Sequence, residues 1–226
     1  MRSKKSRYEA SVDETLLIQS DKEFFDNCKG KRACDYFKNT NPTVLELACG
    51  RGEYTVWLSQ IFPNKNFIGV DVKGERMMLW IKRYRLWIDD REDSLWDNIA
   101  FLRTIIHHLD RFFSPEEVDE IWIIHPDPRP KWHDERRRLT SPRFLNMYYN
   151  ILKPGGILRL KTDDNDLFSY SLEQLWNQYG FELSNMTKDL HQSDLLIDHH
   201  NIITHYEQEA LKENKTIKYA VWKKYL

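Results

Sequence analysis

The first strand-like run of the chain leads into a glycine-containing turn, Thr43-Val44-Leu45-Glu46-Leu47-Ala48-Cys49-Gly50-Arg51-Gly52. A helix-like segment follows from Glu53 to Phe62, and a second strand-like run, Asn66-Phe67-Ile68-Gly69-Val70-Asp71, comes after it. Short apolar runs that alternate with helical segments predict βαβ units with parallel strands. A ligand of such a unit lies outside the carboxyl ends of the strands, so the turn and Asp71 are the first candidates for a site.

The same alternation continues along the chain. Helical character extends from Glu75 to Asp89, from Arg143 to Leu152, and from Asp164 to Tyr179, where Gly180 is a stop signal. The predicted strands are residues 43–47, 66–71, 99–104, 120–125, 157–162, 181–186 and 216–222. We expect an α/β, Rossmann-like fold, with an open, mostly parallel seven-stranded sheet and helices on both faces.

Length and composition indicate one main globular domain. The chain has 226 residues, 41% apolar and 31% charged, so it can bury a sizeable core, which argues against disorder. We expect residues 1–41 to form a basic N-terminal arm and a short helix, and residues 42–226 to form the main domain. The three cysteines lack C-x-x-C spacing, so neither a disulfide framework nor a metal site is expected. Without a signal peptide or membrane-spanning run, a cytoplasmic location is expected.

The charge is balanced overall but clustered locally. The net charge is 34 − 35 = −1, which argues against a protein that coats DNA. Residues 2–7 nevertheless carry four basic and no acidic side chains, and residues 129–143 carry six basic and two acidic ones. Such clusters favour local contact with a polyanion, although a solvated charged surface is the simpler alternative, above all for the first cluster.

The glycine turn favours one nucleoside cofactor over another. Asp71 lies 19 residues after Gly52, close to the spacing at which a carboxylate accepts hydrogen bonds from ribose hydroxyls. A nicotinamide dinucleotide requires a third glycine, but that position is Thr55, and the nearby Glu46 carboxylate would repel a pyrophosphate. A carboxylate there suits the cationic methionyl end of S-adenosylmethionine, so methyl transfer is favoured over hydride transfer.

A proline-rich loop follows the predicted strand 120–125. Pro126, Pro128 and Pro130 occupy alternate positions and stiffen the chain, which holds Asp127 rigidly beyond the carboxyl edge of the sheet. The basic run of residues 136–138 comes next and can meet phosphates while Asp127 faces a base. Asp127 as a turn or helix cap is the structural alternative.

The glycine turn, the proline loop and the basic run resemble segments of a known enzyme family. The chain resembles the bacterial tRNA (guanine-N7-)-methyltransferase family, class I S-adenosylmethionine-dependent enzymes that modify the variable-loop guanine at tRNA position 46. The resemblance extends from about residue 40 to the end. It rests on Leu45-Glu46-Leu47 with Gly50 and Gly52, Pro126-Asp127-Pro128 with Pro130-Lys131, Arg137-Arg138-Leu139-Thr140, Lys161-Thr162-Asp163, and Thr204-His205-Tyr206-Glu207.

The resemblance implies a role for each of these segments. Asp127 is expected to be the catalytic carboxylate and to lie next to the cofactor. The residues expected to bind S-adenosylmethionine are Glu46, Gly50, Gly52, Asp71, Ile105 and Asp127. The residues expected to bind the tRNA are Lys131, His133, Asp134, Glu135, Arg136, Arg137, Arg138, Asp163, Thr204, His205, Tyr206 and Glu207. The resemblance implies tRNA as partner, with no membrane and no obligate protein partner, and a monomer or homodimer.

Two positions depart from the family pattern. Ile105 stands where the family usually has an acidic residue after the third strand, which puts the contact to the adenine amino group in doubt. Arg129 replaces the usual tryptophan of the proline loop, and Trp132 is a candidate to supply the aromatic surface instead. Two alternatives therefore stay open: a methyltransferase that acts on another RNA, and a tRNA-binding homologue with impaired catalysis.

Overall fold

The computed structural model describes residues 15–20, 23–31, 35–78, 80–81, 97–177 and 180–225. The chain forms two compact units, Met1–Ser114 and Pro115–Leu226, and each is described by itself. The predicted basic cluster at residues 2–7 lies outside the described residues, as do residues 79 and 82–89 of the predicted helix 75–89.

Among its described residues, the first unit contains four strands in the order β1-β4-β3-β2. They are β1 (Leu17–Ile18), β2 (Thr43–Leu47), β3 (Asn66–Asp71) and β4 (Ile99–Arg103), and all neighbours are parallel. Every residue of β2 is buried, as in a parallel sheet covered on both faces. Its helical elements include α2 (Glu23–Asn27), α3 (Glu53–Ile61), the 3₁₀ turn η3 (Ile106–His108) and α5 (Leu109–Phe112), and residues 74–78 and 80–81 are also helical.

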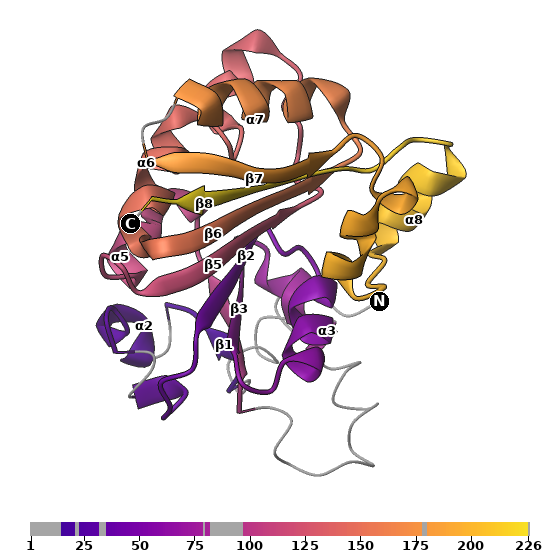
Figure 1. Cartoon of the computed structure of the whole chain (residues 1–226). Coiled ribbons are helices and arrows are strands. Elements are labelled where there is room, and N and C mark those ends of the chain that lie inside the picture. The colour runs from indigo at the N-terminus through magenta and orange to yellow at the C-terminus, as the bar shows by residue number, and fades with distance from the viewer. Residues whose placement is uncertain are drawn as a thin grey trace. The chain divides into compact units, whose positions relative to one another are not determined.

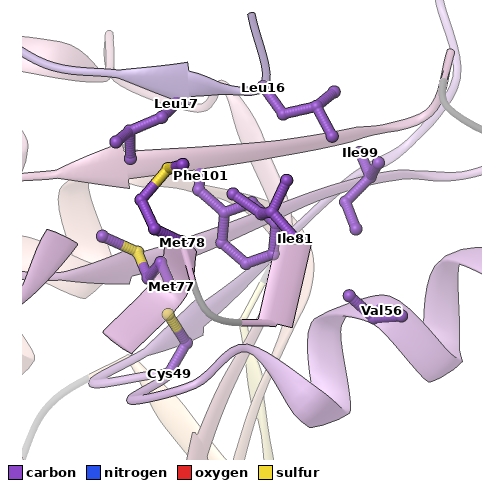
Figure 2. Packing of buried hydrophobic residues seen from close by; sticks show 9 residues of the cluster. All are labelled: Leu16, Leu17, Cys49, Val56, Met77, Met78, Ile81, Ile99 and Phe101. Atoms are coloured by element: carbon purple, nitrogen blue, oxygen red, sulfur yellow. The ribbon is translucent and has the colours of Figure 1, made fainter. Parts of the chain in front are cut away.

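Phe101 of β4 lies in the buried cluster of the first unit. Figure 2 shows its ring among Met78, Ile81 and neighbouring apolar side chains. Two glycines are required by this packing, because a Cβ at Gly52 or Gly69 would lie 2.3 Å or 2.9 Å from the Phe101 ring. The core that supports the glycine turn therefore leaves no room for a side chain at either position.

In the described part of the second unit, four strands follow the order β5-β6-β8-β7 (Figure 1). They are β5 (Val118–Ile124), β6 (Leu152–Thr162), β7 (Phe181–Thr187) and β8 (Lys218–Lys224). β5 and β6 are parallel, whereas β8 is antiparallel to both β6 and β7. The helical elements are η4 (Trp132–Arg137), α6 (Pro142–Ile151), α7 (Asn165–Asn177), η5 (Leu190–Gln192), η6 (Asp194–His199) and α8 (His205–Lys212).

The predicted α/β class with mainly parallel strands is confirmed. All seven predicted strands are present, and the structure adds the two-residue β1, which is too short to produce a periodic signal. β6 begins five residues before the predicted strand, because an irregularity in its pairing with β5 accommodates Gly155 and Gly156. Within the described residues, no helix has the length and apolar character needed to cross a membrane.

Candidate functional site

The predicted site residues fall into two sets, one in each unit. In the first unit the parallel strands β2, β3 and β4 end at the same edge. Glu46 lies at the end of β2, Asp71 ends β3, and Ile105 follows β4 by two residues. The Thr104 amide donates to the Asp71 carbonyl at 3.1 Å, so the segment that carries Ile105 is tied to β3. The structure thus brings these three predicted residues to one edge of the sheet, and their binding of a cofactor stays a prediction.

The turn after β2 is built from left-handed residues. Ala48, Gly50 and Gly52 have φ angles of 58°, 59° and 78°. A Cβ on Gly50 would meet nothing closer than the Ala48 carbonyl oxygen at 4.0 Å, so glycine keeps the space beside the turn open. Gly52 is instead explained by its packing against Phe101, and its predicted contact with a cofactor stays a prediction.

Asp71 is oriented by two backbone amides. Gly50 N donates to Oδ2 at 2.9 Å, and Lys73 N donates to Oδ1 at 2.8 Å. The first of these bonds joins the turn after β2 to the end of β3. Each carboxylate oxygen accepts more than one hydrogen bond, so the fixed Asp71 can still accept from a pair of ligand hydroxyls.

Glu46 is a buried carboxylate at the amino end of α3. Its Oε2 accepts hydrogen bonds from the amide of Thr55, at 2.7 Å, and from the Thr55 hydroxyl. Burial, partly offset by these two bonds, raises the pKa of Glu46 to about 8. Among the described residues no group donates to Oε1, so this oxygen is available to a cationic ligand.

Ile105 and Cys49 complete the edge of the first unit. Ile105 is half exposed and has no polar atom on its side chain, so it can give a ligand an apolar surface and no hydrogen bond. Cys49 is buried, and desolvation raises the pKa of its thiol well above the usual value. Cys49 is therefore a packing residue rather than a reactive thiol.

In the second unit, Asp127 is presented by the proline loop. His125, directly after β5, has a φ of 44°, and its amide donates to the Lys161 carbonyl of β6 at 2.8 Å. The Asp127 side chain is 60% exposed, and its Oδ2 lies 3.2 Å from Nη2 of Arg129. The structure thus has an exposed carboxylate on a constrained loop, as the sequence predicts.

Asp163 lies beside the same loop, because β5 and β6 are parallel neighbours. Its Oδ1 is 3.2 Å from Nδ1 of His125, and Lys215 Nζ lies 3.6 Å from its other oxygen. The hydrogen bond from His125 is the main reason that the pKa of Asp163 is lowered to about 2. Asp163 is therefore an anion at any physiological pH.

The three basic residues 136–138, at the end of η4 and directly after it, expose only part of their charge. Arg137 Nη1 lies 3.0 Å from Oδ1 of Asp134, and Arg136 is exposed without a salt-bridge partner among the described residues. Arg138 differs, since its guanidinium lies over the Tyr170 ring at 4.5 Å and its Nε donates to the Arg129 carbonyl at 3.3 Å. Arg136 and Arg137 thus face outward, whereas Arg138 is engaged within the unit.

The remaining residues of η4 and Lys131 are also at the surface. Lys131, Trp132, His133 and Glu135 are exposed, and Asp134 is half-buried. The pKa of Asp134 is lowered mainly by its hydrogen bond with Arg137. This segment therefore presents a mixed charged and aromatic surface, on which Asp134 is paired with Arg137.

The predicted segment Thr204 to Glu207 divides into two pairs. Thr204 Oγ1 caps α8 by accepting from the Glu207 amide at 3.3 Å, and both side chains are buried. His205 and Tyr206 are exposed on the first turn of α8. Only the second pair can touch a large ligand without rearrangement, so a substrate contact through Thr204 or Glu207 stays a prediction.

Lys161 and His191, which are not among the predicted site residues, lie beside Glu207. Lys161 Nζ lies 2.6 Å from Oε2 of Glu207, and Nε2 of His191 lies 2.9 Å from Oε1. Burial lowers the pKa of Lys161, although Glu207 opposes that shift. A lysine in a strand is usually predicted to face solvent. No sequence pattern links it to a glutamate 46 positions later.

Comparison with known proteins identifies relatives of this chain. Residues 40–220 match a family described as "Putative methyltransferase". The tRNA (guanine-N(7)-)-methyltransferase of Cytophaga hutchinsonii is 41% identical over 220 residues, 96% of each chain. The enzyme of that name from Bacteroides fragilis is 45% identical over 193 residues, 84% of this chain and 72% of that protein.

Structural comparison supports the fold separately. The crystal structure of the 16S rRNA methyltransferase KamB has a TM-score of 0.60 and 11% identity, and the match covers 82% of this chain and 89% of that chain. At such low identity the likeness concerns the fold alone. The family match and the two relatives go further, and they show that this chain belongs to the tRNA (guanine-N(7)-)-methyltransferase family.

Proposed function

We propose that this protein transfers a methyl group from S-adenosylmethionine to N7 of a guanine in the variable loop of tRNA, at position 46. The observation that carries the proposal is the exposed Asp127 carboxylate on a proline loop, in a chain that belongs to the tRNA (guanine-N(7)-)-methyltransferase family. A carboxylate in that setting can stabilise the positive charge that a purine base acquires when it is methylated.

Several groups of the first unit suit S-adenosylmethionine as a ligand. Oε1 of Glu46 is available to the cationic methionyl end, and the fixed Asp71 carboxylate can accept from ribose hydroxyls. The open space at Gly50 lets the backbone approach the ligand, and Ile105 supplies an apolar surface. When bound, S-adenosylmethionine supplies the electrophilic sulfonium methyl group.

The reaction requires little acid–base catalysis from the protein. Guanine N7 already exposes a lone pair, so no proton has to leave before attack on the methyl carbon. Positioning therefore supplies most of the acceleration. Asp127 accepts hydrogen bonds from the N–H groups of the guanine edge, and its negative charge stabilises the cation that forms.

The outward-facing cations of the second unit are the proposed contacts to the tRNA backbone. Arg136 and Arg137 are exposed on η4, next to exposed Lys131. Phosphate contacts of this kind position an RNA without reading its sequence. We further propose that Asp163 and the exposed His205 and Tyr206 lie about the target nucleotide, and that the enzyme works in the cytoplasm as a monomer or homodimer.

Methyl transfer to defined tRNA transcripts tests the proposal. The purified protein is incubated with labelled S-adenosylmethionine and an unmodified tRNA, and the product is located by digestion and mass mapping. The control transcript has adenine in place of the variable-loop guanine. The proposal predicts N7-methylguanine at that one position and no transfer to the control. Transfer to another position, or none in the presence of both substrates, would contradict it.

A further inference from the structure

The carboxylate proposed to serve the guanine is already bound within the protein. Arg129 Nη2 lies 3.2 Å from Oδ2 of Asp127, and the Arg129 amide donates to Oδ1 at 3.2 Å. One residue therefore engages both oxygens of Asp127, through its side chain and its backbone. Both side chains are accessible, Asp127 at 60% and Arg129 at 34%.

The backbone of Arg129 is fixed although its side chain is at the surface. Arg129 has a φ of 48° and stands between Pro128 and Pro130, in a conformation that a residue before proline seldom adopts. Its carbonyl accepts from Nε of Arg138, and Arg138 itself lies over the Tyr170 ring of α7. The guanidinium is thus the movable part of an otherwise held residue.

This ion pair conflicts with the proposed chemistry. A guanine edge that donates to Asp127 must compete with the Arg129 guanidinium for the same oxygens. A guanidinium beside the base would also repel the positive charge that methylation creates at N7. Productive binding therefore requires the Arg129 side chain to leave Asp127, while the backbone bond from Arg129 can stay.

We propose that Arg129 is a specificity-determining residue that exchanges Asp127 for a phosphate of the RNA backbone when tRNA binds. The inference rests on the proposed function, because it assumes that Asp127 meets a guanine of a polynucleotide. The exchange makes the carboxylate available only where a phosphate lies next to the target base. A free nucleobase or nucleoside, which carries no phosphate, does not release Asp127.

The surroundings of Arg129 suit a phosphate as the second partner. Solvent-exposed ion pairs such as Arg129 with Asp127 are weak, so they are easily replaced. A guanidinium matches the geometry of a phosphate and binds it with charge-assisted hydrogen bonds. Exposed Lys131 and Arg136 follow in the chain and extend the positive surface that a phosphate backbone would meet.

A double-mutant cycle on tRNA affinity separates exchange from simple pairing. The dissociation constant for an unmodified tRNA is measured over a range of salt concentrations for the full chain and for Arg129→Gln, Asp127→Ala and the double variant. In the exchange model Arg129 contributes to tRNA binding whether or not Asp127 is present. Arg129→Gln then weakens binding several-fold in both backgrounds. The loss in the Asp127→Ala background is at least as large, because no ion pair has to be broken there.

The salt dependence gives a second, independent readout. Removing one phosphate contact lowers the slope of log affinity against log salt by about 0.7 to 0.9. This decrease is expected for Arg129→Gln in both backgrounds. Arg143→Gln, which removes an exposed arginine of α6, is the matched control, and its effect is expected to be the same with and without Asp127.

The outcomes are distinguishable from failure of the proposed function. If Arg129→Gln weakens tRNA binding only when Asp127 is present, or leaves binding and slope unchanged, Arg129 is merely a partner of Asp127 and the inference is wrong. Methyl transfer by the unaltered protein is measured in the same preparation. Transfer to tRNA together with either of these results overturns the inference alone, whereas absence of transfer overturns the proposed function.

Discussion

Lys161 and Glu207 form an ion pair in which Nζ lies 2.6 Å from Oε2 and each side chain is only 1% exposed. One residue comes from β6 and the other from α8, so the pair joins the helix to the sheet. His191 of η5 binds the other oxygen of Glu207 at 2.9 Å. The same carboxylate thus organises three elements of the second unit beneath the exposed His205 and Tyr206.

Replacing Glu207 with glutamine should destabilise the fold strongly. Lys161 would keep its charge in a buried site without a compensating partner, and breaking a buried pair in this way costs about 3–5 kcal/mol. Urea denaturation of both proteins measures the difference in free energy of unfolding. Glu209→Gln is a matched control, because Glu209 lies on the same helix and pairs with Lys212 at the same 2.6 Å, but on the surface. Equal effects of the two substitutions would show that Glu207 is not a buried anchor.

Glu46 should make stability and donor binding depend on pH. Its pKa is raised from 4.5 to about 8 in the folded chain, so the folded state holds a proton that the unfolded state releases. Stability is then fullest below 4.5 and decreases as the pH rises toward 8, by at most about 1.4 kcal/mol per unit. Denaturation at several pH values measures this slope. In Glu46→Gln the decrease should be absent, and a slope unchanged by that substitution would exclude Glu46 as its source.

The folded chain without a ligand favours the protonated form of Glu46. A cationic ligand favours the ionised form instead. Binding of S-adenosylmethionine should therefore strengthen from pH 6 to pH 8 and release a proton, by the reciprocity of linked equilibria. Calorimetry in buffers of different ionisation enthalpy measures the proton release. The result expected for Glu46→Gln is weaker binding with little pH dependence, and an equal pH dependence in both proteins would place the titrating group elsewhere.

Trp132 and Trp176 offer a controlled test of base stacking. Their exposed fractions are 86% and 85%, but Trp132 begins the basic segment η4, whereas Trp176 lies near the end of α7. If Trp132 stacks on a base, Trp132→Ala should weaken tRNA binding by about 1–3 kcal/mol. Trp176→Ala should leave the affinity unchanged, and Trp132→Phe should retain part of it. Similar affinities for both alanine variants would argue against stacking by Trp132.

The neighbouring arginines should differ in what they contribute. Arg136→Gln should reduce the salt slope of tRNA binding by about 0.7 to 0.9 without affecting stability, because Arg136 is exposed and unpaired among the described residues. Arg138→Gln should lower the melting temperature instead, since it removes the contact with Tyr170 and the bond to the Arg129 carbonyl. Thermal unfolding and salt-dependent affinity together distinguish the two variants. If both variants changed the same quantity to the same extent, the different roles given to Arg136 and Arg138 would be wrong.

The sequence contained enough information for most of the fold. The parallel strands are short runs rich in apolar residues, because both faces are buried, and glycine or proline lies within a few residues of their ends. The two-residue β1 was not predictable, since a pair of apolar residues has no period. The early start of β6 was also missed, because Gly155 and Gly156 look like a turn and only the register with β5 shows them within the strand.

Local segments of the candidate site were predictable, but the partners of their side chains were not. Asp127 follows from three prolines after a strand, and Asp71 from its spacing to the glycine turn. The pairing of Arg129 with Asp127, the inward orientation of Arg138 and the Lys161–Glu207 pair depend on side-chain directions that only the folded chain fixes. A run of three arginines reads as one basic patch, although one of the three packs on an aromatic ring.

The central claim is that the Asp127 carboxylate stabilises the guanine cation that forms as N7 is methylated. The most direct measurement is the single-turnover rate of methyl transfer to tRNA by Asp127→Ala and by the unaltered protein, at saturating S-adenosylmethionine and tRNA. Asp127→Ala removes a preorganised electrostatic contact, so the rate should decrease by a factor of about 10² to 10³. Binding of S-adenosylmethionine should be preserved. An Asp127→Ala variant that methylates the variable-loop guanine at the unaltered rate would contradict it.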